Sequence, residues 1–452
     1  MDNPSLPTDQ SNTQHLTATE VPDNELIATL AAAGIAIVEL DKIMISIAAA
    51  GVACKYLSSI WSTYEPYHGD GGQARYTRYL LNEVRPDLFH EIVRMERTTF
   101  TNLVEELKTN GYIKDGRLVS AEEQVLIFLD IVCHNNNMRQ TAVKFHCGLY
   151  TIQRYFALIL DSLYNMYPNY VKFDLESCKQ PSRISEDPKY RPLHSALGAL
   201  DGVLCFSRRA AFQSTQSPPS STHPQLSSST VFIPAGVPSE LQSPWRNRKG
   251  FLAQNVLAAV NFNFEFVYVL AGWEGSAHDT RVFNDATSKG LKIAKKKYFL
   301  ADAGYGLRHG LMTPFRGTQH HLKEQANAGK KPSNNKELYN LRHATLRNIV
   351  ERIFGCIKRK FSILQAPPEI ELKKQVRLVY ALCMLWNFIR SHESIGNLFD
   401  DPDEDARTYR RTRMDTDTVN LDEEDSKMNA RREQISRNLW KQYVEYNYNK
   451  QS

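Results

Sequence analysis

Cysteine in a chemically useful pattern is the first thing that the sequence lacks. The 452 residues include seven cysteines, none of them in a C-x-x-C pair or in a Cys/His spacing typical of a zinc site. This argues against a disulfide scaffold and a structural zinc module, and favours reduced, packed cysteines in an intracellular protein. The polar stretch 1–25 also lacks the pattern of a secretory leader, and we expect it to be disordered.

Long hydrophobic runs are also missing. Two apolar runs near the start, Leu26 to Val38 and Ile43 to Cys54, are separated by the charged segment 39–42, whereas a membrane-spanning helix needs roughly 20 apolar residues. We expect apolar helices within 26–70 rather than a membrane hairpin, because the turn of such a hairpin would lie within the hydrocarbon. No membrane partner is predicted.

A large charge of one sign is absent too. Lysine and arginine number 55, and aspartate and glutamate number 50. An excess of this size permits a nucleic-acid partner without requiring one. The length allows two or three domains with a sizeable core, so the distribution of residue types along the chain is more informative than the totals.

Helical patterns lie on both sides of the central part of the chain. Residues 71–185 show apolar residues at three- and four-residue spacing, and Ser120 followed by Glu123 is typical of a helix N-terminus. The tail 396–452 mixes dense acids and bases before an amphipathic stretch at 431–446. We expect an all-α region before the central domain and a charged linker with an accessory helix after it.

Part of the first helical region fits a helix-turn-helix. A short helix from Arg139 to Phe145, a turn with Gly148 and a longer helix from Thr151 have the spacing of that motif. An ordinary helical hairpin has the same spacing, so both interpretations stay open. If the motif binds DNA, the residues that face the DNA are Tyr150, Gln153 and Arg154.

Residues 190–395 alternate between strand and helix patterns. The segment from Asp279 reads as a helix, and after a polar excursion the stretch "LRNIVERIFGCIKRKF", residues 346–361, reads as a second helix. The order strand, strand, strand, helix, strand, helix predicts an α/β domain with a mixed sheet and flanking helices. The apolar runs that predict the strands are "ALGALDGVLCF", "QNVLAAVNF", "EFVYVLAGW" and "KYFLADAGY".

A low-complexity segment interrupts this domain at about 203–243. It is rich in serine, proline and glutamine, and such a composition cannot bury enough apolar surface to order itself. We expect a long loop. It begins directly after Asp201 and Gly202, so it lies next to a candidate site residue.

Three acids occupy unusual positions in the predicted domain. Asp201 ends one apolar run and Asp302 ends another, while Glu351 lies at the edge of the apolar stripe of its helix. Each has an ordinary explanation on its own, since Asp-Gly is common in turns and Glu351 can form a solvated i,i+4 ion pair with Arg347. Acids at two strand ends and on a helix packed across them can nevertheless meet at one sheet edge.

A meeting of three carboxylates predicts a divalent cation. The carboxylates repel one another, and a bound ion is the usual resolution. Oxygen ligands without histidine or cysteine select Mg²⁺ or Mn²⁺ over zinc. Two such ions, roughly 3.5 to 4 Å apart, catalyse phosphodiester cleavage by activating the attacking oxygen and stabilising the leaving one.

Five blocks of the chain resemble, in order, those of the PIF/Harbinger superfamily of DDE transposases and the nucleases derived from them. The resemblance covers about residues 75–395. The blocks are "ALDG", "WRNRKGFLAQNVLAAVNF", "AGWEGSAHDTRVF", "YFLADAGYGL" with "LMTPFRG", and "RNIVERIFGCIKRKFSIL". The resemblance implies an RNase H-like domain that uses two aspartates and a glutamate with Mg²⁺ or Mn²⁺ to cut and rejoin DNA, and this triad falls on Asp201, Asp302 and Glu351.

Further residues match the family's blocks. His278 and Asp279 match its "HD" block, where Asp279 is either a supporting acid near the metal ligands or, as we favour, the N-cap of its helix. Basic residues in two blocks would neutralise DNA phosphates without reading sequence; a solvated basic face is the other explanation. These residues are Arg246, Arg248, Lys249, Arg347, Arg352, Lys358, Arg359 and Lys360.

The chain departs from the family directly after Asp201 and Gly202. Members commonly continue with a Thr-His-Ile-Pro-like stretch, and removing roughly 203–231 restores that pattern here. We hypothesise that this segment is a lineage-specific loop or a translated intron. A spliced message without the segment would reject the loop.

The resemblance implies a transposase-like DNA endonuclease in the nucleus, with DNA as its substrate. A separate Myb-like DNA-binding partner is also implied, because relatives often work with one. A domesticated, catalytically inactive DNA-binding protein on the same fold is the main alternative, and the insertion beside a metal ligand favours it. A metal-dependent RNase or resolvase is a weaker third interpretation.

Overall fold

The structure is a computed structural model of the 452-residue chain. It describes residues 72–204, 236–238, 240, 242–247, 252–317, 332–366, 368, 370–394, 396 and 425–451, together with Lys42 and Ser46, which are helical. The chain divides into two compact units, Met1–Gly71 and Gly72–Ser452, and the following concerns the second. The predicted disordered segment 1–25, nearly all of 26–70 and most of the predicted insertion lie outside the described residues.

The first part of this unit is helical, as predicted. Its elements are α2 (Gly72–Arg78), the π-helical η1 (Tyr79–Glu83), α3 (Pro86–Val93), α4 (Arg97–Thr109), α5 (Ala121–His134), α6 (Met138–Lys144) and α7 (Leu149–Tyr170). Helix α5 is buried over nearly its whole length, and Phe128 from it stacks on Phe156 of α7, with ring centroids 5.4 Å apart. Helix α5 is therefore the centre of this region.

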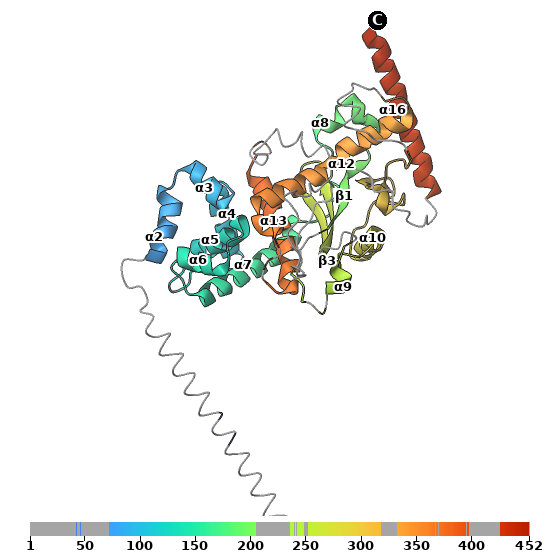
Figure 1. Ribbon diagram of the computed structural model, residues 1–452. Helices are drawn as coiled ribbons and strands as arrows, with labels where there is room; N and C mark the ends of the chain where they lie inside the picture. The colour runs from blue at the N-terminus through green and yellow to red at the C-terminus, as the bar shows by residue number, and fades with distance from the viewer. Residues whose placement is uncertain are drawn as a thin grey trace, which may run out of the picture. The chain divides into compact units, whose positions relative to one another are not determined.

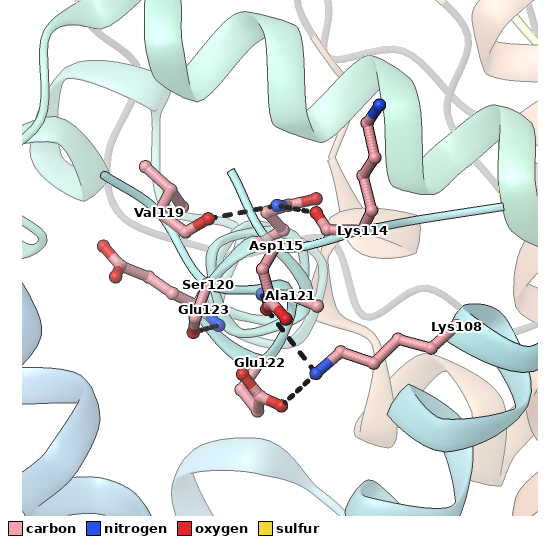
Figure 2. A network of polar contacts seen from close by, with 9 residues as sticks. Lys108, Lys114, Asp115, Val119, Ser120, Ala121, Glu122 and Glu123 are labelled. Atoms are coloured by element: carbon pink, nitrogen blue, oxygen red, sulfur yellow. Dashed lines mark hydrogen bonds and ion pairs between the residues drawn. The ribbon is translucent and has the colours of Figure 1, made fainter. Parts of the chain in front are cut away.

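Polar contacts determine where α5 begins (Figure 2). Ser120 is the N-cap and accepts a hydrogen bond from the Glu123 N–H at 3.2 Å, which confirms the predicted helix start. Asp115 accepts from the Ala121 N–H at 2.9 Å, and the Lys108 ammonium lies 2.8 Å from Glu122. These contacts satisfy N–H groups that a helix start leaves without intrahelical partners.

The short helix α6 is held against α5 by a buried aspartate. Asp130 accepts hydrogen bonds from Thr141 at 2.9 Å and Asn136 at 3.1 Å, and it pairs with Lys144 at 2.5 Å. Gly148 is the N-cap of α7. The short helix, turn and long helix predicted from the sequence are therefore present, each within about two residues of the expected bounds.

The second part is a five-stranded mixed sheet flanked by helices. The strands are β1 (Ala196–Leu204), β2 (Gln254–Asn261), β3 (Phe266–Glu274), β4 (Tyr298–Ala301) and β5 (Leu311–Met312), in the order β3-β2-β1-β4-β5. Strand β1 is antiparallel to β2 and parallel to β4, β2 is antiparallel to β3, and β4 is parallel to β5. The four strands predicted from apolar runs are confirmed, and the two-residue β5 was not predicted.

Helices cover both faces of this sheet. Helices α12 (Asn335–Lys360) and α13 (Leu372–His392) pack on one face, and α10 (Asp279–Ser288) packs on the other (Figure 1). Five short elements and one long helix complete the unit. The short elements are α8 (Ser182–Ser185), η2 (Pro188–Leu193), α9 (Gln242–Trp245), η4 (Ala303–Tyr305) and η5 (Ser362–Gln365), and the long helix is α16 (Ser426–Gln451). The strand order and flanking helices are those of an RNase H-like fold, which agrees with the predicted fold class.

Strand alternation produces two separate cores. Ala199 of β1 and Leu300 of β4 belong to the core shared with α12 and α13, whereas Leu200 and Ala301 belong to the core shared with α10. Successive side chains of a strand point to opposite faces, so both strands change face at each residue. Within the described residues, no helix is long and apolar enough to cross a membrane.

Candidate functional site

The register of β1 and β4 brings two aspartates together. Leu200 pairs with Ala301 across the parallel strands, so the next positions, Asp201 and Asp302, are neighbours. Alternation turns Asp201 toward the same face as Ala199, which is the face that α12 covers. Asp302 follows β4 directly and accepts a hydrogen bond from the Ala303 N–H at 2.7 Å as the N-cap of η4.

The predicted position of Asp201 at a strand end is wrong. Strand β1 continues to Leu204, and Asp201 pairs with Ala258 of β2 within the sheet. Gly202 is consequently a strand residue and not the second residue of an Asp-Gly turn. The aspartate therefore projects from rigid, regular structure, which determines its direction more tightly than a turn would.

Helix α12 carries the third acid, Glu351, and also Arg347. The sequence predicted that Arg347 either contacts DNA phosphates or forms a solvated ion pair with Glu351. Glu351 is 6% exposed, and its Oε1 lies 2.6 Å from Arg347 Nη2 one turn earlier. The other end of the same guanidinium, Nη1, lies 2.9 Å from Asp201 Oδ2. Arg347 thus bridges two of the three predicted acids, and its side chain is only 8% exposed.

The pKa values at this site are shifted because the groups are buried and because several acids lie near one arginine. Burial raises the pKa of Asp201 to about 7, with Arg347 opposing this and Asp302, Glu351 and Asp279 adding to it. Burial also raises the pKa of Glu351, against the lowering effect of Arg347. Burial alone would lower the pKa of Arg347, but the surrounding carboxylates outweigh it and raise the pKa. The strand register and the Arg347 bridge thus bring the predicted acids near one another.

Asp279 is a fourth acid at this place, and the N-cap role favoured for it is wrong. The N-cap of α10 is His278, and Asp279 is the first helical residue. A Cβ added to Gly202 would lie 3.2 Å from Asp279 Oδ1, and one added to Gly304 would lie 3.0 Å from Oδ2. The Asp279 carboxylate therefore lies against two glycines, which leave it the space that side chains would fill.

Two buried polar groups at this site were missed by sequence reasoning. The Tyr305 hydroxyl would lie 2.7 Å from a Cβ on Gly202, and Asn255 Oδ1 would lie 3.6 Å from it. Within the described residues, neither of these oxygens has a hydrogen-bond partner, although buried polar groups normally have one. In the sequence, only the glycines of "DG" and "DAG" pointed to these two groups, because a glycine next to an acid leaves space for another side chain.

The oxygens available at the site suit a hard cation. Asp302 Oδ2 and Glu351 Oε2 accept no hydrogen bond from any residue that the structure describes. Asp201, Glu351 and Asp302 act on the single arginine, and Asp279 acts on Asp201, so carboxylates outnumber cations among these residues. The donor chemistry fits Mg²⁺ or Mn²⁺. Arg347 lies between Asp201 and Glu351. In the described ranges, no group of three Asp, Glu, His or Cys side chains is arranged so that it could hold a metal ion.

The predicted basic residues fall into three groups: buried residues, exposed residues and residues that the structure does not describe. Arg347 and Lys360 are each 7% exposed, and Lys360 donates to the Arg94 carbonyl; neither occupies the surface position that a phosphate contact needs. Arg248 and Lys249 lie outside the described residues. The remaining four are at least partly exposed: Arg246, Arg352, Lys358 and Arg359.

The helix-turn-helix candidates are at the surface. Tyr150, Gln153 and Arg154 are all exposed on the first turns of α7, while Ile152 and Phe156 on the same helix are buried. Such a face is available to a partner. DNA contact by these residues stays a prediction.

Comparison with known families assigns the second part of the chain. Residues 228–387 match the family described as DDE superfamily endonuclease. Over these residues the chain is similar to a DDE superfamily endonuclease domain. Residues 73–165, which include most of the helical region, match a domain of unknown function, DUF8040. No curated protein and no solved structure matched the chain.

The DDE superfamily endonuclease match covers only part of the acid site. It includes Asp279, Asp302 and Glu351, but it begins at residue 228 and so excludes β1 with Asp201. Its start falls within the predicted insertion, close to residue 231, where the family's pattern was expected to resume. The pairing of β1 with β2 and β4 nevertheless makes Asp201 part of the same sheet as the matched strands.

Proposed function

We propose that the chain is a PIF/Harbinger-type DNA endonuclease that cleaves phosphodiester bonds with Mg²⁺ or Mn²⁺, using Asp201, Asp302 and Glu351. One observation carries the proposal: Asp201 on β1 and Asp302 directly after the parallel strand β4 are neighbours, and the helix that carries the glutamate packs against both strands. The match to a DDE superfamily endonuclease supports the reaction class.

The three acids would hold the metal, starting from Asp302 Oδ2 and Glu351 Oε2, which accept no hydrogen bond from the described part of the chain. The bound ions supply activation of the attacking water or hydroxyl and stabilisation of the leaving oxygen. Arg347 orients Asp201 and Glu351 through its two hydrogen bonds and offsets part of their repulsion. The strand and helix backbones keep all three acids in place before substrate arrives, which is the preorganisation that catalysis needs.

Nicking of supercoiled DNA tests the proposal. We expect the purified full chain to nick DNA with Mg²⁺ or Mn²⁺ and not with EDTA, and Asp302→Asn to abolish nicking. Asp161→Asn is the matched control, because Asp161 is a half-exposed aspartate paired with Arg377 at 2.6 Å on another surface. Unchanged nicking by Asp302→Asn would refute the assignment of this residue.

A domesticated DNA-binding protein without catalysis is the second candidate. The observation that favours it is the Arg347 bridge, which occupies two of the acids with a side chain rather than an ion. The segment that begins at residue 203 directly follows a proposed ligand and adds to this argument. DNA binding by the wild-type chain without nicking in either metal would support this candidate over the endonuclease.

The partners and the location are proposals as well. We propose that the protein acts on DNA in the nucleus together with a separate Myb-like DNA-binding protein, on the strength of the family resemblance and of short basic runs such as 358–360. A fluorescent fusion that stays outside the nucleus would contradict the location. Sequencing the transcript decides whether 203–231 is present in the message.

A further inference from the structure

Three side-chain oxygens meet on the side of β1 that faces α10. Successive residues of a strand point to opposite faces, so Gly202 faces α10 while Asp201 faces α12. A Cβ on Gly202 would lie 2.7 Å from the Tyr305 hydroxyl and 3.2 Å from Asp279 Oδ1. The same Cβ would lie 3.6 Å from Asn255 Oδ1. These three oxygens, which we call the oxygen cluster, therefore surround one point, and they come from η4, α10 and β2.

Two oxygens of the cluster are buried without a hydrogen-bond partner. Tyr305 and Asn255 are each 1% exposed, and within the described residues neither the Tyr305 hydroxyl nor Asn255 Oδ1 forms a hydrogen bond. The orientation of the Asn255 amide is fixed, because its Nδ2 donates to the Ala277 carbonyl at 3.3 Å, so an oxygen and not an N–H points at the cluster. Buried polar atoms normally have a partner. Two that lack one at the same place indicate a shared ligand.

The chemistry of the cluster favours a cation as this ligand. Asn255 Oδ1 and an ionised Asp279 can only accept, so the ligand either donates hydrogen bonds to both or carries a positive charge. Burial raises the pKa of Tyr305, and Asp279, Asp201 and Asp302 raise it further, so the hydroxyl lies in the negative field of three aspartates. A cation is attracted by this field, whereas a water molecule, which has no net charge, gains much less from it.

A single positive charge is what the cluster can balance. Asp279 supplies its one carboxylate, the other two oxygens are neutral, and the nearby Asp201 is already paired with Arg347 at 2.9 Å. A divalent ion would leave uncompensated charge in a buried place, which is costly. Mg²⁺ also usually keeps several of its waters, whereas two of the three side chains here are closed to bulk water. The donor set therefore fits a monovalent ion better than a divalent one.

We propose that Asn255, Asp279 and Tyr305 bind a monovalent metal cation, Na⁺ or K⁺, on the α10 side of the sheet. The ion joins β2, α10 and η4 at the position of Gly202. Asp302 is the N-cap of η4, so the ion also holds in place the segment that follows this acid. The site goes beyond the proposed function, because it requires neither DNA nor a divalent metal.

Thermal unfolding of the full chain in EDTA tests the site. KCl or NaCl replaces tetramethylammonium chloride at constant ionic strength, because the organic cation has the same charge but cannot be coordinated by buried oxygens. The unfolding midpoint of the wild type should rise with K⁺ or Na⁺ and approach the slow logarithmic rise of a saturated site. Tyr305→Phe removes one ligand and should raise the half-saturating cation concentration by about tenfold. Asp279→Asn keeps the shape of the side chain but removes its charge, and should have the same effect.

Tyr298→Phe is the matched control. The Tyr298 hydroxyl is also buried and, within the described residues, has no hydrogen-bond partner. The charged group over its ring is Arg431, at 4.8 Å, and not an acid. Tyr298→Phe should therefore keep the wild-type response to K⁺ and Na⁺.

Two results would overturn the ion. One is a wild-type midpoint that is the same in all three salts. The other is a loss in Tyr305→Phe that is equal in every salt, which would mean that the hydroxyl binds water or a carboxylate instead. A response to K⁺ or Na⁺ that Tyr305→Phe weakens would support the site even in a chain that never nicks DNA, because the assay contains no DNA and no divalent metal. Nicking by a chain without this response would overturn the site and leave the endonuclease proposal standing.

Discussion

Replacing Arg347 by methionine should destabilise the metal-free protein strongly. The change keeps a long apolar side chain but removes the guanidinium that, within the described residues, pairs with both Glu351 and Asp201. Breaking a buried ion pair from one side costs about 3 to 5 kcal/mol. Asp201 keeps 22% exposure, so water screens part of the loss and we expect about 3 kcal/mol in the free energy of unfolding.

The pH dependence of this loss has a definite sign. Without Arg347, the pKa values of the two carboxyl groups in the folded state lie further above their unfolded values, because burial is no longer opposed. A carboxyl whose folded pKa is raised loses stability as the pH rises through that range. The deficit of Arg347→Met against wild type should therefore be larger at pH 8 than at pH 5.

Urea unfolding followed by circular dichroism, in EDTA, measures the effect. Arg377→Met is the matched control, because Arg377 pairs with Asp161 at 2.6 Å with about half of each side chain exposed, and such surface pairs contribute about 0 to 1 kcal/mol. Added Mn²⁺ should then stabilise Arg347→Met more than wild type, because the ion takes over the role of the guanidinium; a ligand at a hundred times its Kd adds about 2.7 kcal/mol.

Two results would refute this reasoning. A loss in Arg347→Met no larger than that in Arg377→Met would mean that the carboxylates do not depend on the arginine. Equal stabilisation of the variant and the wild type by Mn²⁺ would mean that arginine and metal do not share a site. In the second case the competition between arginine and metal for these carboxylates is ruled out, while the ion-pair assignment survives.

Three further changes follow from the same structure. Asp302→Asn should change the free energy of unfolding by less than about 0.5 kcal/mol, because asparagine is as good an N-cap residue for η4 as aspartate. A loss above about 2 kcal/mol in urea unfolding would show that the charge of Asp302 stabilises the fold. Gly202→Ala should lower the free energy of unfolding by about 1 to 3 kcal/mol, since its Cβ would lie 2.7 Å from the buried Tyr305 hydroxyl. Gly355→Ala in α12, where the nearest contact of a Cβ is at 3.9 Å, should raise the free energy of unfolding by about 0.5 to 1 kcal/mol. Equal effects of the two changes would contradict the close approach at Gly202. Burial raises the pKa of Glu122, but hydrogen bonds, that from Lys108 foremost, outweigh it and leave the pKa below its ordinary value. The cost of Lys108→Met should therefore be present at pH 7 and disappear as the pH falls through the lowered pKa of Glu122; a cost independent of pH would rule this out.

The sequence by itself determined the elements of the fold. Strand periodicity and apolar runs located β1 to β4, and the three-and-four spacing located α5, α6 and α7 close to their observed bounds. These patterns are local, since they depend on which side of a strand or helix is buried. The same patterns placed Asp201, Asp302 and Glu351 at the boundary of the cores, where a carboxylate is costly without a partner.

Only the tertiary structure decided what those carboxylates meet. Arg347 and Asp201 are separated by 146 positions, and helical spacing predicted only the local pair of Arg347 with Glu351. Asp279 fits the pattern of a helix cap, yet the glycines of two other segments give its carboxylate a place among the acids. Periodicity indicates which side of a helix or strand is buried. Which residue lies across the interface depends on how distant elements pack, and the ion pair between Arg347 and Asp201 forms across such an interface.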